Sequence, residues 1–227
     1  MISKLIVVGG GKGGVGKSLV AAGLIDTAIE QKRNVLLIES DTSVPDVYKA
    51  YNGIVKSLAI DLDNKEGWIT LLDALNDNEG TAILNTGARN DKGVKLFGSL
   101  LMTALPELKC QLETLWVIGR DRSSVELLAN YMEAMKHGVI HVVRNTHYGD
   151  GEKFQLYNES TTRKKIESAG GKTIDFPDLA DRVANAIRNG PTGNLAISKG
   201  ATDLSFGDRI ELSRWRSDVW ISLGDVV

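Results

Sequence analysis

The stretch LIVVGGGKGGVGKSL, residues 5–19, decides the fold of this chain. It begins within a short apolar run, residues 4–8, whose β-branched residues are typical of a buried strand. Glycines follow, and residues 18–31 carry apolar side chains at helical spacing. The sequence therefore predicts a strand, a glycine-rich loop and a helix in direct succession.

A loop of this composition is suited to binding phosphate. Glycines tolerate positive φ and let oxygens approach the backbone, so successive N–H groups can surround an anion. Lys17 can place its ammonium against the β and γ phosphates, the Ser18 hydroxyl can bind Mg2+, and the helix N-terminus adds its positive end. We therefore expect ATP or ADP, with Mg2+, at residues Gly11, Gly13, Gly14, Val15, Gly16, Lys17, Ser18 and Leu19.

The same glycines also fit a second pattern, the dinucleotide-binding turn. Gly9, Gly11 and Gly14 satisfy G-x-G-x-x-G, and Glu39 ends the next predicted strand, where a ribose-binding carboxylate would stand. A dinucleotide turn has no need of a Lys-Ser pair, whereas a triphosphate site needs both side chains. The pair that ends the loop therefore favours the phosphate-binding interpretation.

Beyond the loop, short apolar runs alternate with helical periodicity. Strands are predicted at 34–38, 80–84, 114–118, 139–143 and 173–176, with a further one at 55–62, and helices at 67–75, 93–105, 123–136, 160–169, 179–188 and 207–223. Such alternation predicts an α/β fold of three layers, a mostly parallel twisted sheet with helices on both faces. The length suits a single P-loop ATPase domain over residues 1–227, with the last helix packed on the core.

The composition excludes several other classes of protein. The 27 basic and 29 acidic side chains leave a net charge of -2, which excludes a general affinity of the whole molecule for nucleic acid. A single cysteine, Cys110, excludes an intramolecular disulfide framework. The apolar start is far shorter than the ~20 residues that a membrane span requires, and it lacks a small-residue cleavage site. We therefore expect a cytoplasmic protein.

The motif Lys12-Gly13-Gly14-Val15-Gly16-Lys17-Ser18 resembles the deviant Walker A motif of the ParA and MinD ATPases, in which a second lysine precedes the usual one. The resemblance covers about residues 1–190. In that family the extra lysine reaches across a nucleotide-sandwich dimer to the phosphates of the other subunit. The resemblance therefore implies that ATP drives dimerisation, and that Lys12 acts in trans beside Lys17 on the charge of the transferred phosphate.

The second predicted strand is followed by acidic residues, at the edge of the sheet where ligands bind in open parallel folds. The family pattern here is D-x-D. Asp41 falls on the second carboxylate, which helps to position water and Mg2+, and Glu39 is a conservative departure from the first. Asp41 is thus the first candidate for hydrolysis, with a turn-capping aspartate as the alternative. Asp46 is another acidic candidate, for which helix capping is the favoured role.

The strand predicted at 80–84 is followed by Asn85, where the family normally places a Walker B aspartate. An amide can orient the waters of Mg2+ but cannot supply the negative charge of a carboxylate, so slow hydrolysis is expected. With Asn85 at this position and with its segments 142–145 and 176–179, the chain resembles the plasmid StbB and TraL branch of the ParA-like proteins.

Three later residues resemble the base-binding positions of the family. Asn145 follows a predicted strand at the place where the wider family uses an asparagine amide to recognise the donor-acceptor edge of adenine. Pro177 and Asp178 follow the next strand and resemble the segment whose backbone packs on the base. Their alternatives are a strand-end turn and a helix cap.

The resemblance also implies partners: a homodimer formed on ATP binding and a protein partner encoded nearby. Nonspecific DNA is a further candidate through the basic run 163–165, although a solvated helix face is the favoured interpretation of that run. Membrane binding by the C-terminal helix is disfavoured, because the acidic residues Asp208, Glu211, Asp218 and Asp225 dilute its positive face.

The sequence thus predicts an ATPase that binds and slowly hydrolyses ATP, and whose dimerisation is a switch in plasmid stability, segregation or conjugative transfer. Two alternatives stay open. A metabolic P-loop enzyme of the dethiobiotin synthetase type would need a second small-molecule pocket. A nucleotide-sensing scaffold with little hydrolysis is the other, because Asn85 replaces the expected carboxylate.

Overall fold

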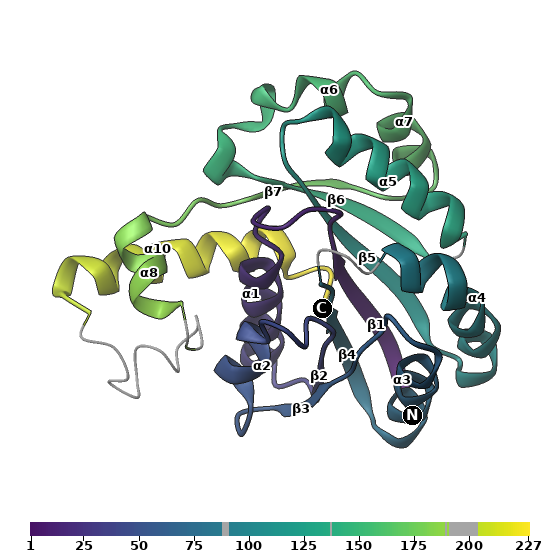
Figure 1. Cartoon of the computed structure of the whole chain (residues 1–227). Coiled ribbons are helices and arrows are strands. Elements are labelled where there is room, and N and C mark those ends of the chain that lie inside the picture. Colours follow the sequence, from purple (N-terminus) through teal and green to yellow (C-terminus); the bar gives the residue numbers. More distant parts are fainter. Residues whose placement is uncertain (88–90, 137, 189, 191–203) are drawn as a thin grey trace.

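The computed structural model describes residues 1–87, 91–136, 138–188, 190 and 204–227 of the chain. Within them, seven strands form one sheet in the order β3-β2-β4-β1-β5-β6-β7, and every pairing is parallel (Figure 1). The strands are β1 (Ile2–Gly9), β2 (Val35–Glu39), β3 (Lys56–Ala59), β4 (Gly80–Asn85), β5 (Gln111–Ile118), β6 (Val139–Asn145) and β7 (Thr173–Phe176).

Helices cover both faces of the sheet, so the protein has three layers (Figure 1). One face carries α1 (Lys17–Glu30), α2 (Asp46–Tyr51), α8 (Asp181–Ile187) and α10 (Phe206–Leu223). The other carries α3 (Lys65–Asp77), α4 (Asp91–Leu108), α5 (Arg122–Ala134), α6 (Gln155–Asn158) and α7 (Thr161–Ser168). Because side chains alternate along a strand, β1 sends Ile6 and Val8 to the first face and Leu5 and Val7 to the second.

The C-terminal helix α10 packs on α1 and β7. Ser205 and Asp208 form a capping box at its start. Its apolar residues Leu212, Trp215, Val219 and Leu223 are buried in the core of that face. A Cβ added to Gly23 of α1 would lie 2.9 Å from Val219, so the two helices are in close contact. In the described part of the chain, no helix combines the length and the apolar character that crossing a membrane requires.

The three-layer α/β fold predicted from the sequence is confirmed, and the structure differs from the prediction in local features. Helices α2 and α6 are not among the predicted elements, since their six and four residues are too few to show a helical period. The strand predicted at 55–62 is shorter, and forms β3 over Lys56–Ala59 only. Helix α4 was expected to end at residue 105 and instead continues through Pro106 to Leu108. A proline removes one N–H donor and crowds the carbonyl four residues earlier, and α4 extends only two residues beyond it.

Candidate functional site

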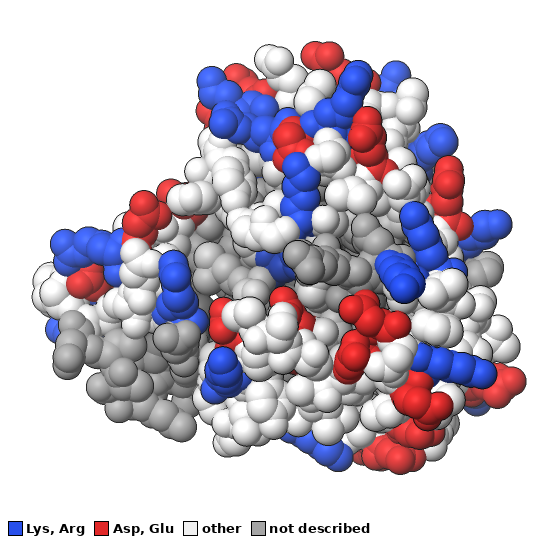
Figure 2. Space-filling view, in the orientation of Figure 1, with Lys and Arg blue, Asp and Glu red and all other residues white. Residues whose placement is uncertain are grey.

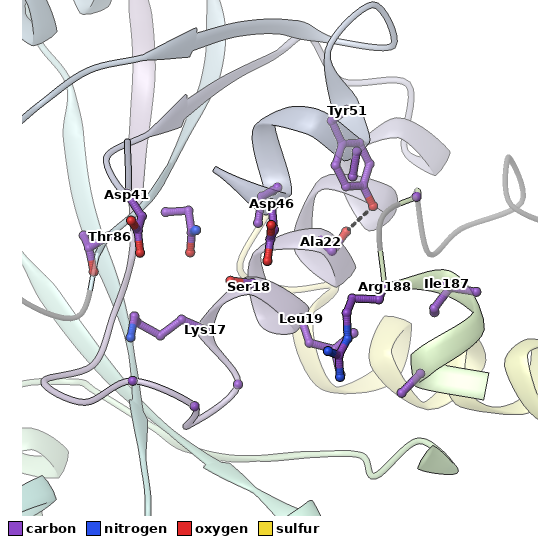
Figure 3. A pocket seen from close by; sticks show the side chains of 18 residues that line it. Lys17, Ser18, Leu19, Ala22, Asp41, Asp46, Tyr51, Thr86, Ile187 and Arg188 are labelled. Carbon is purple, nitrogen blue, oxygen red and sulfur yellow. Dashed lines mark hydrogen bonds between the residues drawn. The ribbon is translucent and has the colours of Figure 1, made fainter. Parts of the chain in front are cut away.

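A cavity of about 440 Å3 opens beyond the carboxyl ends of the strands. It is lined by the glycine-rich loop, by Asn85 at the end of β4, by Asp41 and Thr86 just after β2 and β4, and by residues of α1, α2 and α8. Figure 3 shows Lys17, Asp41 and Thr86 at one end of this cavity, and Tyr51 and Arg188 at the other.

The structure brings some of the predicted site residues to this cavity and places others away from it. Those that line it are Gly13, Gly14, Gly16, Lys17, Ser18, Leu19, Asp41 and Asn85. The remaining predicted residues, Gly11, Lys12, Val15, Asn145, Pro177 and Asp178, are not among its lining residues.

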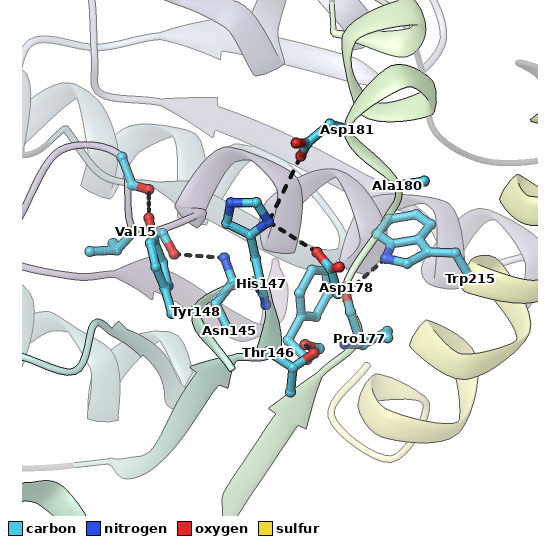
Figure 4. Close-up of polar contacts among 12 residues, drawn as sticks. Val15, Asn145, Thr146, His147, Tyr148, Pro177, Asp178, Ala180, Asp181 and Trp215 are labelled. Carbon is cyan, nitrogen blue, oxygen red and sulfur yellow. Dashed lines mark hydrogen bonds and ion pairs between the residues drawn. The ribbon is translucent and has the colours of Figure 1, made fainter. Parts of the chain in front are cut away.

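The last residue of β6 and the turn after this strand form hydrogen bonds to the loop. The Asn145 Nδ2 donates a hydrogen bond to the Val15 carbonyl at 3.0 Å, and the Tyr148 hydroxyl donates to the Gly14 carbonyl (Figure 4). Gly16, which precedes α1, has φ 106°, in the left-handed region that favours glycine. A Cβ on Gly16 would lie 2.4 Å from the Asn145 Nδ2. Both the backbone conformation and this contact therefore require glycine.

Gly16→Ala should destabilise the protein more than Gly14→Ala. Both positions have positive φ, which costs an L-residue roughly 1–2 kcal/mol, but a Cβ on Gly14 would meet nothing within 4 Å. Only Gly16→Ala adds the clash with Asn145, and overpacking of this kind costs roughly 1–3 kcal/mol more. Urea unfolding of the nucleotide-free variants measures the difference. Equal losses of stability in the two variants would show that Asn145 yields without cost.

The two lysines of the loop have different surroundings. Lys17 is 8% exposed, and its Nζ donates to the Lys12 carbonyl at 2.7 Å. The Lys12 side chain turns instead to α5, where its Nζ pairs with the Asp121 carboxylate at 2.7 Å. This hydrogen bond holds the pKa of the Asp121 carboxyl well below its usual range. Asp121 also caps α5 by accepting from the Ser124 backbone N–H. In this state Lys12 is therefore bound by its own chain.

The ends of β2 and β4 meet in a buried polar contact. The Glu39 side chain is fully buried, and its carboxylate accepts from the Asn85 Nδ2 at 3.1 and 3.0 Å and from the Asp41 backbone N–H at 2.9 Å. Burial raises the pKa of the Glu39 carboxyl to about 7, although the hydrogen bonds from Asn85 and Asp41 oppose this shift. The Asp41 side chain lines the cavity and accepts from Ser43 and from the Val44 backbone.

The residues predicted to contact the base connect β6, β7 and α10 instead of lining the cavity (Figure 4). Pro177 accepts from the Trp215 Nε1 at 2.9 Å, and the Asp178 carboxylate lies 3.0 Å from the His147 Nδ1. The capping alternative for Asp178 is wrong, because α8 begins after Ala180 with no side-chain cap. Asp46 is likewise no capping side chain: Pro45 precedes α2, and Asp46 lines the cavity.

Comparison with known proteins identifies the family. Residues 6–188 match the model of the CobQ/CobB/MinD/ParA nucleotide-binding domain, a range that includes the phosphate loop and the strand ends around the cavity. The chain belongs to this MinD/ParA family. Protein MobD of Acidithiobacillus ferrooxidans is 45% identical over 219 residues, covering 96% of this chain and 95% of MobD.

Solved members of the MinD/ParA family share the fold at low sequence identity. The MinD cell division protein of Aquifex aeolicus has a TM-score of 0.58 and 16% identity, covering 98% of this chain and 97% of MinD. A Borrelia burgdorferi B31 protein assigned to plasmid partition, bound to AMPPNP, has a TM-score of 0.56 and 14% identity, covering 100% of both chains. Both likenesses concern the fold alone.

Several residues of this MinD/ParA-type site were missed by sequence reasoning. Thr86 lines the cavity, as does Arg188 at the far end. Asp121 binds Lys12 although the two are 109 positions apart. Among these residues the sequence gives a signal only for Thr86, which follows a predicted strand at the ligand-binding edge of the sheet.

A small cavity of about 30 Å3 lies beneath the loop on the opposite face of the sheet. It is lined by Gly9 and Gly10 before the loop, by Thr86 and Gly87 after β4, and by the Trp116 ring. That ring is 3% exposed, and a Cβ on Gly9 would lie 3.0 Å from it. Its Nε1 has no hydrogen-bond partner among the described residues. Trp116 therefore packs directly under the start of the phosphate loop.

Proposed function

We propose that this chain is a cytoplasmic ATPase of one domain, which binds ATP with Mg2+, dimerises around the nucleotide and hydrolyses it slowly. Its nucleotide state would act as a switch in plasmid stability, segregation or conjugative transfer. One observation carries the proposal: the buried ammonium of Lys17 and the hydroxyl of Ser18 share a cavity with the Asp41 carboxylate, at the N-terminus of α1. Cation, metal ligand and acid thus converge where a triphosphate is expected to bind.

The residues at the cavity fit a magnesium ion held mainly through phosphate oxygens and water. In the described part of the chain no three His, Cys, Asp or Glu side chains gather into a metal site. Mg2+ characteristically binds to one or two protein groups, keeps several waters and takes substrate phosphates as its other ligands. The Asn85 Oδ1, which is buried and has no hydrogen-bond partner among the described residues, fits such a water. Ser18, Asp41 and Asn85 would then hold the ion, which would offset the charge of the phosphates.

Hydrolysis would proceed by direct attack of water, with no covalent intermediate. Asp41 would orient the water, and Lys17, with Lys12 of the partner subunit, would stabilise the charge that develops on the phosphate oxygens. Lys12 does not line the cavity of its own chain, which suits a lysine whose target lies in another subunit. Asn145, Pro177 and Asp178 are proposed to contact adenine, and Asn145 also supports the loop by its bond to Val15.

Nonspecific DNA is a candidate partner, and a local patch would have to bind it. Basic and acidic side chains are interspersed over the face shown in Figure 2. Within the basic run, the Arg163 Nε pairs with Glu167 at 2.7 Å, so part of its charge is balanced on the same helix. The apolar face of α10 is buried against the rest of the protein, so it is not exposed to enter a membrane. We propose further that the chain belongs to the StbB or TraL branch of the family, on the residues that resemble it.

Steady-state phosphate release distinguishes the proposed switch from the two alternatives, a metabolic P-loop enzyme and a nucleotide-sensing scaffold. Wild-type protein is assayed with Mg2+ and ATP alone, with duplex DNA, and with a series of small carboxylic acids as acceptors. We expect a slow basal rate that DNA or a protein partner raises and that small acceptors leave unchanged. A rate that depends on an acceptor would establish the metabolic enzyme instead. Nucleotide binding without measurable release in any condition would establish the scaffold.

A further inference from the structure

Strands β2 and β4 place Glu39 and Asn85 side by side. The two residues are register partners in the parallel pair, and their side chains are 0% and 3% exposed. Both Glu39 oxygens accept from the Asn85 Nδ2, and one of them also accepts from the Asp41 backbone N–H. One carboxylate thus fixes two groups that border the nucleotide cavity: the amide of Asn85 and the backbone of Asp41.

The orientation of the Asn85 amide follows from this contact. A carboxylate accepts hydrogen bonds, so the amide nitrogen faces Glu39 and the Oδ1 is directed away from it. Asn85 lines the cavity, and its Oδ1 is buried without a hydrogen-bond partner among the described residues. Folded proteins rarely leave such an acceptor unsatisfied, and the exceptions call for an unseen water, ion or ligand.

The charge on Glu39 is not needed to make these hydrogen bonds. Its donors are an amide and a backbone N–H, and burying a charge adds a desolvation cost that these two bonds alone do not require. A glutamine at this position would place an NH2 group against the Asn85 Nδ2 in place of one of the two oxygens, so it would not hold the amide in the same orientation. A buried carboxylate is better explained by a cation that enters the neighbouring cavity. Strand β4 ends in an amide at this point, so β2 supplies the negative charge instead.

We propose that Glu39 is the positioning residue of the magnesium site, acting through Asn85: its carboxylate holds the amide so that Oδ1 receives a hydrogen bond from a metal-bound water. The inference rests on the proposed nucleotide site and adds a residue to it. The negative charge that β4 lacks is carried by its register partner on β2, one strand away. Glu39 contacts neither nucleotide nor metal in this arrangement.

Calorimetric titration with a non-hydrolysable ATP analogue tests this, with each protein titrated in Mg2+ and in EDTA. The ratio of the two dissociation constants is the affinity gained from the metal. Glu39→Gln should reduce this gain roughly tenfold to a hundredfold, the usual effect of removing a group that orients a metal ligand, while the affinity in EDTA is unchanged. A merely structural role would lower the affinity equally in both buffers.

The exchange variant Glu39→Gln/Asn85→Asp is the matched control. It returns a carboxylate to the cavity on β4 and gives it a neutral partner on β2, so the metal-dependent gain should recover. Asn85→Ala, which deletes the acceptor and leaves Glu39 in place, should lose the gain as Glu39→Gln does. If Glu39→Gln does not fold, an unchanged gain in Asn85→Ala would still overturn the inference.

Two results would overturn the inference: an unchanged metal-dependent gain in folded Glu39→Gln or Asn85→Ala, or an exchange variant no better than Glu39→Gln. Failure of the proposed function looks different. In that case the wild-type protein would bind no nucleotide, with or without Mg2+.

Discussion

Lys17→Ala should abolish ATP binding. The ammonium of Lys17 is buried within the phosphate loop, and in this structure it is held by the Lys12 carbonyl at 2.7 Å. Against the β and γ phosphates it would make two charge-assisted contacts, each worth about 1.5–3 kcal/mol. Since about 1.4 kcal/mol corresponds to a factor of ten in affinity, the dissociation constant should rise roughly a hundredfold or more. Titration with a fluorescent ATP analogue measures it.

Lys12→Ala is the matched control for that experiment. It removes the same charge from the same loop, but from a side chain that does not line the cavity. ATP binding by the monomer should therefore be nearly unaffected, and circular dichroism checks that both variants are folded. Wild-type affinity in Lys17→Ala would mean that the loop binds no phosphate.

Lys12→Ala should instead weaken ATP-induced dimerisation. In a symmetric dimer two such lysines meet the phosphates of the opposite subunit, so the variant loses two contacts of about 1.5–3 kcal/mol each. The bond to Asp121, which must break first, is a half-exposed pair worth about 0–1 kcal/mol, so the contact in trans outweighs it. We expect the dimer dissociation constant to rise by roughly two orders of magnitude. Sedimentation velocity with Mg2+ and a non-hydrolysable analogue resolves that change.

Asp121→Asn should strengthen ATP-induced dimerisation, the opposite of the effect of Lys12→Ala. Asparagine caps a helix as well as aspartate does, so α5 should keep its cap while Lys12 loses its partner. Dimerisation should strengthen, by up to roughly thirtyfold, because two surface pairs no longer have to be broken. Wild-type protein that stays monomeric at high concentration with analogue and Mg2+ would remove the trans-lysine mechanism altogether.

The fold was predictable because its signals are local. A single stretch of sequence contains the apolar run of β1, the glycines after it and the helical periodicity of α1. The remaining strands are buried apolar runs of the same kind as β1. The features that could not be predicted are short elements and contacts between residues far apart in the sequence. Helix α2 has too few residues for a period, and α4 continues two residues past Pro106, although proline usually ends a helix.

The candidate site was predictable where one loop supplies it. Gly13 to Ser18 line the cavity as a consecutive segment, apart from the buried Val15. Contacts between strands depend on register, which the sequence does not state, so the sequence identifies Glu39 only as a conservative departure from the family pattern and does not predict its pairing with Asn85. The pairing of Lys12 with Asp121 joins the loop to a helix start far along the chain, and no sequence period connects the two.

The position of Trp116 gives the protein an optical reporter of its own. The indole touches Gly9 before the phosphate loop and shares its small cavity with Thr86 and Gly87, so a shift of either segment changes the polarity around the ring. Two other buried indoles also border the segments of the proposed site, since Trp68 lines the same small cavity and Trp215 donates to the Pro177 carbonyl. The difference in emission between the wild-type protein and Trp116→Phe isolates the signal of Trp116, whose colour change can then follow nucleotide binding in real time without an attached dye.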